Sequence, residues 1–241
     1  MSTSTRRNYI ITGATGTLGR QVSRLLVARG DRVMLLGRNQ QQLAELKQQL
    51  AADDRVITHS GDLSTPEGGQ HAVSVAADTF KEIHGLVHLV GLFIPGPVSS
   101  TPLPLYQRLF QANVLTAISI TQPLLAYLAE GANLIYASSF LAHDPVQGLS
   151  GYAASKAALV AWCKALAREL RPRVSVNVVS TTTLASPEAR ARFQGKAAAR
   201  LLEPESVAQV IASLTTPEMR AIHGAVVPVY GNFALEDPAF L

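Results

Sequence analysis

Seven short runs of β-branched and other apolar residues alternate along the chain with longer segments of helical periodicity. The predicted strands are Asn8–Thr12, Arg32–Leu36, Arg55–His59, Leu86–Val90, Asn133–Ala137, Val174–Val178 and Val226–Tyr230. Apolar residues three and four positions apart predict helices over Thr17–Arg29, Gln40–Ala51, Pro66–Phe80, Leu103–Ala129, Tyr152–Leu170 and Pro204–Leu214. Strands that are apolar on both faces are typical of parallel sheets, and strict β–α alternation requires right-handed crossovers. The sequence therefore predicts an α/β fold with a doubly wound, seven-stranded parallel sheet and helices on both faces.

The chain of 241 residues is 47% hydrophobic and 16% charged, a composition that supports one large core. Because no repeat or linker interrupts it, we expect a single domain over residues 1–241. One excursion, at about 181–203, separates the sixth strand from the last helix. A connection of this length is usually a lid or binding loop, and it begins at the carboxyl end of a strand, where open α/β sheets bind ligands.

Composition and charge argue against several classes of partner. The net charge of +4 comes from scattered basic residues, so nucleic acid is not expected as a partner. The segment from Met1 to Asn8 is polar and the apolar run after it is too short for a signal sequence, which indicates a cytoplasmic protein without a membrane partner. Cys163 is the one cysteine and is expected to be buried. His84 and His88 straddle the predicted start of a strand without acidic or cysteine partners, so no metal site is expected.

A glycine-rich turn follows the first strand directly and opens the first helix. It reads Thr12-Gly13-Ala14-Thr15-Gly16-Thr17-Leu18-Gly19. Glycines at such a turn let the backbone approach a pyrophosphate, and the free N–H groups of the helix attract its charge. The position of this turn predicts a dinucleotide-binding site.

A second pattern predicts acid–base chemistry. Tyr152 and Lys156 are four residues apart in a predicted helix and therefore share a face. A phenol needs about 4 kcal/mol of preferential phenolate stabilisation to bring its pKa from about 10 to near 7, and a nearby lysine ammonium is one source. Ser139 follows the fifth strand, where its hydroxyl could hold a substrate oxygen beside the tyrosine.

Together these motifs resemble the short-chain dehydrogenase/reductase family over nearly the whole chain. The family's glycine turn matches Gly13 and Gly19, and its last strand motifs match 176–179 and 223–226. The resemblance implies a Rossmann-type fold, an NAD(P)-dependent oxidoreductase acting on a carbonyl or alcohol substrate, and a homodimer or homotetramer. The apolar side chains of the helix that begins at Tyr152 favour the same oligomeric expectation.

The resemblance also implies roles for individual residues. Tyr152 would be the general acid/base, Ser139 would polarise the carbonyl, Asn113 would hold a water in a proton relay, and Lys156 would bind the nicotinamide ribose and lower the pKa of the tyrosine. The implied cofactor-binding residues are Gly13, Thr15, Gly16, Thr17, Leu18, Gly19, Arg38, Asp62, Leu63, Gly91, Tyr152, Lys156, Leu184 and Ser186.

The chain departs from the family's pattern in three places. After the fourth strand the family usually has Asn-Asn-Ala-Gly, whereas this chain has His88-Leu89-Val90-Gly91. After the sixth strand, Thr181-Thr182 replaces Pro-Gly. In the glycine turn, Thr17 stands where the family often has a second glycine, and Gly16 gives the spacing of longer-chain relatives. The departure after the fourth strand keeps open an alternative function, a non-catalytic NADP(H)-binding sensor or regulator with the same fold.

The end of the second strand predicts the choice of cofactor. Enzymes that select NAD place an acidic residue there to bind the ribose 2′-hydroxyl. This chain has Gly37 followed by Arg38, whose guanidinium suits a 2′-phosphate. Asn39 with Gln42 also fits a helix cap, and both interpretations can hold. We therefore expect a preference for NADP(H), with NAD(H) as the alternative.

Overall fold

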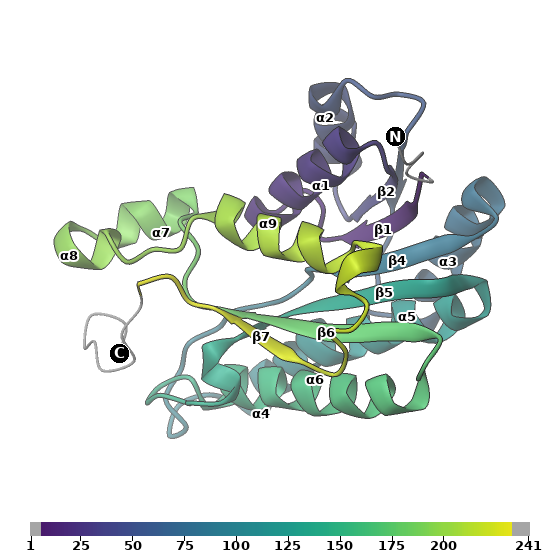
Figure 1. Ribbon diagram of the computed structural model, residues 1–241. Coiled ribbons are helices and arrows are strands. Elements are labelled where there is room, and N and C mark those ends of the chain that lie inside the picture. The colour runs from purple at the N-terminus through teal and green to yellow at the C-terminus, as the bar shows by residue number, and fades with distance from the viewer. Residues whose placement is uncertain (1–5, 233–241) are drawn as a thin grey trace.

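As predicted, the strands of the described residues form one seven-stranded parallel sheet, and their order is β3-β2-β1-β4-β5-β6-β7. The computed structural model describes residues 6–232 (Figure 1). The strands are β1 (Asn8–Thr12), β2 (Arg32–Gly37), β3 (Val56–Ser60), β4 (Ile83–His88), β5 (Leu128–Ser139), β6 (Val174–Thr181) and β7 (Val226–Val229). Every residue of β1 is buried, because β1 lies inside the sheet and is covered on both faces.

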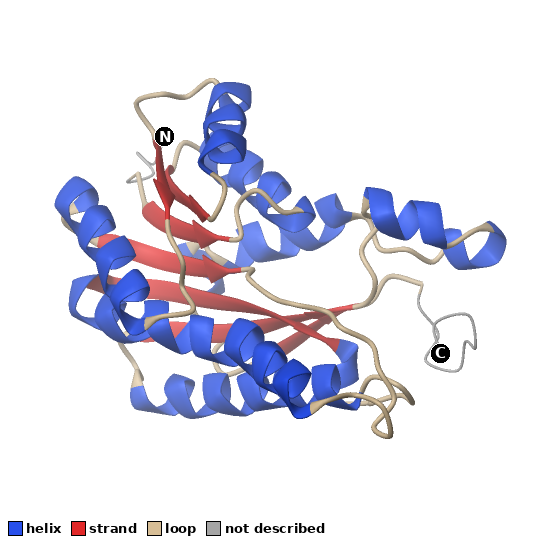
Figure 2. Ribbon diagram, turned by 180° about the vertical axis from the view of Figure 1, so that it is seen from behind, coloured by secondary structure: helices blue, strands red, loops and turns tan. Residues whose placement is uncertain are grey.

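Two layers of helices cover the sheet (Figures 1 and 2). One core cluster joins the sheet to α3, α5 and α6, and the other joins it to α1, α2 and α9. The helices are α1 (Thr17–Arg29), α2 (Gln40–Leu50), α3 (Pro66–Phe80), α4 (Leu103–Phe110), α5 (Thr116–Leu124), α6 (Ser150–Glu169), α7 (Pro187–Arg192), α8 (Gly195–Ala198) and α9 (Pro204–Leu214).

The excursion predicted at about 181–203 contains two short helices, α7 and α8, which project beyond the carboxyl ends of the strands (Figure 1). A parallel bridge between Leu184 and Leu202 closes its base, and the Arg190 guanidinium lies 2.7 Å from the Glu203 carboxylate. The excursion is therefore tied to the sheet at its base while its tip extends outward.

The prediction of a single helix over Leu103–Ala129 is wrong. The segment is divided into α4, a π-helical turn η1 (Gln111–Leu115), α5 and a 3₁₀ turn η2 (Leu125–Tyr127). It ends earlier than predicted because Leu128 pairs with Ile83 and starts β5. Residues 103–127 are long and apolar enough to cross a membrane by length and composition, and 44% of their most apolar window is buried inside the protein.

The fourth strand starts three residues earlier than predicted and ends at His88, so that Leu89 and Val90 leave the sheet. His84 and His88 both lie within β4 rather than across its start, and both rings accept or donate hydrogen bonds. Among residues 6–232, no group of histidine, cysteine and acidic side chains could hold a metal ion. Cys163 is buried as expected, and burial raises the pKa of its thiol.

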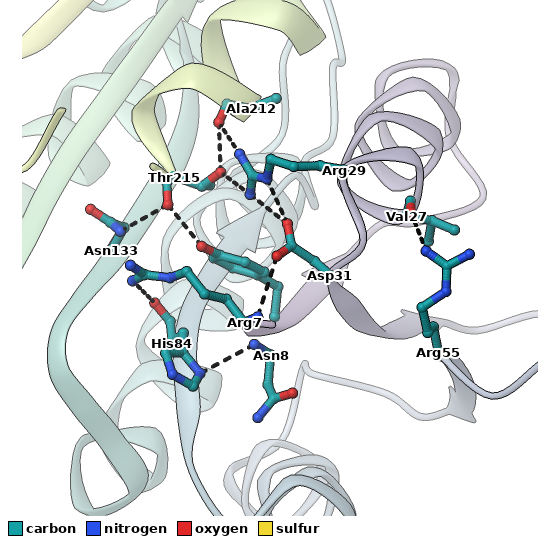
Figure 3. A network of polar contacts seen from close by, with 11 residues as sticks. Arg7, Asn8, Val27, Arg29, Asp31, Arg55, His84, Asn133, Ala212 and Thr215 are labelled. Carbon is teal, nitrogen blue, oxygen red and sulfur yellow. Dashed lines mark hydrogen bonds and ion pairs between the residues drawn. The ribbon is translucent and has the colours of Figure 1, made fainter. Parts of the chain in front are cut away.

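A polar network at the amino edge of the sheet joins α1, β1 and the end of α9 (Figure 3). Arg29 forms an ion pair with the buried Asp31 at 2.6 Å and donates to the Ala212 carbonyl and the Thr215 hydroxyl, which links α1 to the end of α9. The Tyr9 hydroxyl donates to the Thr215 carbonyl at 2.7 Å. This network holds the amino edge together, and the carboxyl edge is left for the site.

Replacing Tyr9 with Phe should lower the free energy of unfolding by about 1 kcal/mol, because a buried hydroxyl that donates one hydrogen bond is removed without changing the ring. Urea denaturation would measure the change. The exposed Tyr127→Phe is the matched control and should leave stability unchanged. Equal losses in the two variants would contradict a stabilising role for the Tyr9 hydrogen bond.

Candidate active site

A cavity of about 280 Å³ opens at the carboxyl edge of the sheet, where β1 and β4 are neighbours. The chain leaves β1 toward α1 on one face and leaves β4 toward α4 and α5 on the other. The two connections therefore diverge, as they do at the ligand-binding crevice of doubly wound sheets. The cavity is lined by Gly13, Gly16, Thr17, Leu18, Gly19, Leu89, Gly91, Leu92, Phe93, Ala137, Ser138, Tyr152, Lys156, Thr181 and Leu184.

The glycine turn forms one wall of this cavity. Gly13 has a φ of +64°, and a Cβ on it would lie 3.1 Å from the Leu89 carbonyl carbon. A Cβ on Gly19 would collide with the Gly13 carbonyl oxygen and the Ala14 backbone, so the helix and the turn can approach this closely only with glycine there. Gly16 precedes α1 and no side chain caps the helix, so its first N–H groups are available to an anion. The turn therefore fits a dinucleotide pyrophosphate.

Tyr152 and Lys156 form the opposite wall. Both project from the first two turns of α6, and Ser139 is the last residue of β5. Burial raises the pKa of Tyr152, and a hydrogen bond with the Ser139 hydroxyl opposes this increase. The structure thus brings the predicted serine and tyrosine together, in the arrangement that acid–base chemistry at a substrate oxygen requires.

Lys156 is bonded to the backbone of β5. Its ammonium donates to the Ala137 carbonyl at 3.1 Å, and burial lowers its pKa to about 8. The lysine is not among the groups that shift the pKa of Tyr152 in this structure, so its predicted effect on the phenol stays a prediction. Burial desolvates both the ammonium and the phenol, which disfavours the charged form of each.

Asn113 lies behind the cavity wall, in the π-helical turn η1. Its Oδ1 accepts from the Leu92 amide at 2.7 Å, and its Nδ2 donates to the Leu92 carbonyl at 3.0 Å and to the Ser155 hydroxyl at 2.9 Å. Ser155 in turn donates to the Tyr152 carbonyl at 2.8 Å. The amide of Asn113 thus joins the loop after β4 to the helix that carries the tyrosine.

Gly91 lies close to the side chains of both Asn113 and Lys156. A Cβ on it would be 3.1 Å from Asn113 Oδ1 and 3.2 Å from Lys156 Nζ. Leu184 lines the same cavity, as predicted, whereas the Ser186 hydroxyl accepts from the Ala189 amide at 3.1 Å and caps α7.

The remaining predicted cofactor residues lie along the carboxyl ends of β2 and β3. Arg38 is exposed after β2, and the Asn39 side chain caps α2 by accepting from the Gln42 amide at 3.0 Å, as the capping interpretation expects. Thr15 Oγ1 would be 3.7 Å from a Cβ on Gly37, so the glycine turn reaches the end of β2. Asp62 is exposed and accepts two hydrogen bonds from Ser64, and Leu63 is buried in the core. The predicted cofactor residues from Gly13 to Asp62 therefore follow one another along the carboxyl edge of the sheet.

Several lining residues were not predicted. The Phe93 ring lies edge-on to the Tyr152 ring, with centroids 5.0 Å apart, and is 49% exposed. Leu89, Leu92 and Thr181 also line the cavity. Thr181 is the last residue of β6 and the other three follow the end of β4, and this position, rather than residue type, is the signal that could have found them.

Comparison with known proteins places this site in a class, the dinucleotide-binding oxidoreductases. The short chain dehydrogenase family matches residues 7–197. The chain belongs to the short-chain dehydrogenase/reductase family and is an oxidoreductase that acts on CH–OH and C=O groups. This favours an enzyme over the non-catalytic sensor.

Similar proteins span almost the full chain. An uncharacterized oxidoreductase of Mycobacterium tuberculosis is 28% identical over 95% of this chain and 92% of its own length. A short-chain dehydrogenase/reductase from Brucella melitensis has a TM-score of 0.86 at 26% identity and covers 94% of this chain and 95% of its own. A blue fluorescent protein from a metagenomic library, solved in complex with NADPH, has a TM-score of 0.88 at 27% identity, covering 95% and 98%.

Proposed function

We propose that this protein is an NADP(H)-dependent carbonyl reductase in which Tyr152 is the general acid. The observation that carries this proposal is that Tyr152, whose pKa increase on burial is opposed by the neighbouring Ser139 hydroxyl, lines the same cavity as the glycine turn. A bound nicotinamide dinucleotide would supply the hydride. The solved relative that holds NADPH supports this class of cofactor.

The position of each residue around the cavity indicates its role in binding the cofactor or the substrate. Gly13, Gly16 and Gly19 with the start of α1 would hold the pyrophosphate, and Lys156 would bind the nicotinamide ribose. Thr15, Thr17 and Leu18 belong to the same turn, Asp62 and Leu63 would border the adenine, and Gly91, Leu184 and Ser186 would border the nicotinamide. Ser139 would donate to the substrate carbonyl oxygen, and Tyr152 would donate its proton as that oxygen becomes an alkoxide.

Burial favours the reducing direction. Because it raises the pKa of Tyr152, the phenol holds its proton at neutral pH, which is the form that a proton donor requires. Alcohol oxidation would need the phenolate, and burial makes that form costlier.

The cavity walls indicate an apolar substrate. Among the described residues that line it, Lys156 is the one charged side chain, and Leu89, Leu92, Phe93 and Leu184 supply apolar surface. A neutral ketone or aldehyde with apolar or aromatic substituents fits these walls better than a carboxylate-bearing substrate.

Replacing Tyr152 with Phe should reduce kcat by about 10²- to 10⁴-fold, because the proton donor is lost while the ring is kept. The affinity for NADPH, measured by fluorescence titration, should change by less than about twofold. In the wild type, kcat for reduction should stay constant through neutral pH and fall only as alkaline pH removes the phenol proton. Tyr9→Phe also removes a buried hydroxyl and is the control that should keep wild-type kcat. A Tyr152→Phe variant with wild-type turnover would exclude the tyrosine from the chemistry.

Arg38 supports the preference for NADP(H). Its guanidinium is exposed at the end of β2, and no described residue forms a hydrogen bond with it, so its donors are available to a 2′-phosphate. Gly37 supplies no carboxylate to bind a 2′-hydroxyl.

Replacing Arg38 with Ala should lower the ratio of kcat/KM for NADPH to that for NADH by about tenfold or more, because one charged hydrogen-bonding partner of the phosphate is lost. The exposed Arg24→Ala on α1 changes the net charge equally and should leave the ratio unchanged. A wild-type ratio below one, or equal effects of the two substitutions, would refute the assignment.

A homodimer or homotetramer is also proposed, on the helical segment that precedes α6. Leu159, Val160 and Leu166 of α6 are buried in the core of this chain, so these three side chains cannot form a subunit contact. Among the large apolar side chains that the described residues leave exposed, Leu103, Phe110, Leu115 and Tyr127 lie on the α4–η2 segment. Light scattering at micromolar concentration should give a multiple of the 25.7 kDa chain mass, and a monomeric mass would contradict it.

A cytoplasmic location belongs to the same proposal. It is supported by the partial burial of residues 103–127 in the core, where the segment packs against α3 and α6. Nucleic acid and membrane partners are not part of the proposed function.

A further inference from the structure

His88 is a buried side chain that the proposed chemistry does not use. It is the last residue of β4, is 1% exposed, and lies between Thr12 at the end of β1 and Thr116 at the start of α5. Its Nδ1 is 3.0 Å from Thr12 Oγ1, and its Nε2 is 3.3 Å from Thr116 Oγ1. Both ring nitrogens therefore have a partner in the protein.

The number of protons on each group determines which group donates and which accepts in these hydrogen bonds. The Thr116 hydroxyl donates its one proton to the Ala112 carbonyl at 2.7 Å, so it must accept from His88 Nε2–H. Thr12 Oγ1 accepts from the Leu89 amide at 3.2 Å, and its own proton is then free for His88 Nδ1. The neutral Nε2–H tautomer satisfies every group in this chain. Burial and the nearby Lys156 ammonium lower the pKa of His88 to about 3, which agrees with a neutral ring.

The hydrogen bonds on the Nε2 side reach the π-helical turn that carries Asn113. Ala112 immediately precedes Asn113, and its carbonyl is the acceptor that Thr116 holds. Asn113 in turn joins the loop at Leu92 to Ser155, which is bonded to the Tyr152 carbonyl. The Nδ1 side contacts only the end of β1 and the start of the same loop.

We propose that His88 is a positioning residue whose Nε2–H, through Thr116, holds the turn η1 so that Asn113 braces both the cavity loop and the helix of Tyr152. Its effect on turnover rests on the proposed reductase activity, whereas its effect on Asn113 does not.

Replacing His88 with Gln or with Asn tests the roles of its two ring nitrogens separately. Gln can place a donor where Nε2 lies, and Asn can reach only the position of Nδ1. His88→Gln should therefore keep kcat within about threefold, whereas His88→Asn should lose about tenfold or more, with the NADPH Kd changed by less than about twofold in both. Equal effects of the two amides would overturn the proposal, because a role in filling space alone does not distinguish them.

Thr116→Val tests the next link, and α5 supplies a matched control. Val keeps the branched shape of Thr but removes the hydroxyl. The buried Thr121 on the same helix bonds the Tyr136 hydroxyl at 2.7 Å and lies outside the chain from His88 to Asn113. Thr116→Val should lower kcat about as much as His88→Asn does, and the double variant should be no worse than either single one. Thr121→Val should lower the melting temperature yet keep kcat within about twofold.

Amide hydrogen exchange gives a readout without activity. The Leu92 amide donates to Asn113 Oδ1, so its exchange should accelerate by about tenfold in Thr116→Val and stay unchanged in Thr121→Val. Two-bond ¹H–¹⁵N correlation at neutral pH should show His88 as the Nε2–H tautomer. An Nδ1–H tautomer, or unaltered Leu92 exchange in Thr116→Val, would refute the proposal. A wild-type enzyme without reductase activity would refute the proposed function only, because these two measurements would still decide the role of His88.

Discussion

The divergence of the chain at β1 and β4 is the constraint on which the rest of this structure depends. These neighbouring strands are parallel, yet the chain turns from β1 to α1 on one face of the sheet and from β4 to α4 and α5 on the other. The two connections cannot fill the space between them, so a cavity forms beyond the strand ends. The glycine turn and the loop that begins at Leu89 become its facing walls, and a Cβ on Gly13 would press against the Leu89 backbone.

Burial then sets the protonation state of the groups around that cavity. It raises the pKa of Tyr152 and lowers those of Lys156 and His88. In each case the low-polarity surroundings disfavour the charged form, which is the expected result when no opposite charge lies close. The site therefore holds a protonated phenol, a lysine ammonium with a lowered pKa and a neutral imidazole. This combination suits proton donation to a substrate oxygen better than proton removal from an alcohol.

Hydrogen bonds, rather than packing alone, link the parts of the site that come from distant segments of the chain. His88, Thr116 and Asn113 are up to 28 residues apart, and Asn113 is 42 residues from Ser155. The π-helical turn makes this linkage geometrically available, because it interrupts the regular helix between α4 and α5 where the Asn113 amide and the Ala112 carbonyl are both engaged. The departure from the family's asparagine at His88 is thus part of a satisfied network of buried polar groups.

Local patterns along the chain are enough to predict the parallel sheet, the glycine turn and the helix that carries Tyr152 and Lys156. These features rest on local periodicity and turn chemistry: β1, α1, α3 and α9 have the predicted ends because glycine or proline marks at least one of them. That Leu128 starts a strand depends on the assembled fold, because pairing with Ile83 outweighs a local pattern that a helix fits equally well. The assembled fold also makes Leu159 and Leu166 core residues, brings Phe93 against Tyr152, and bonds Lys156 to the Ala137 carbonyl. Burial and contacts between distant segments are properties of the assembled fold, and no local pattern along the chain encodes them.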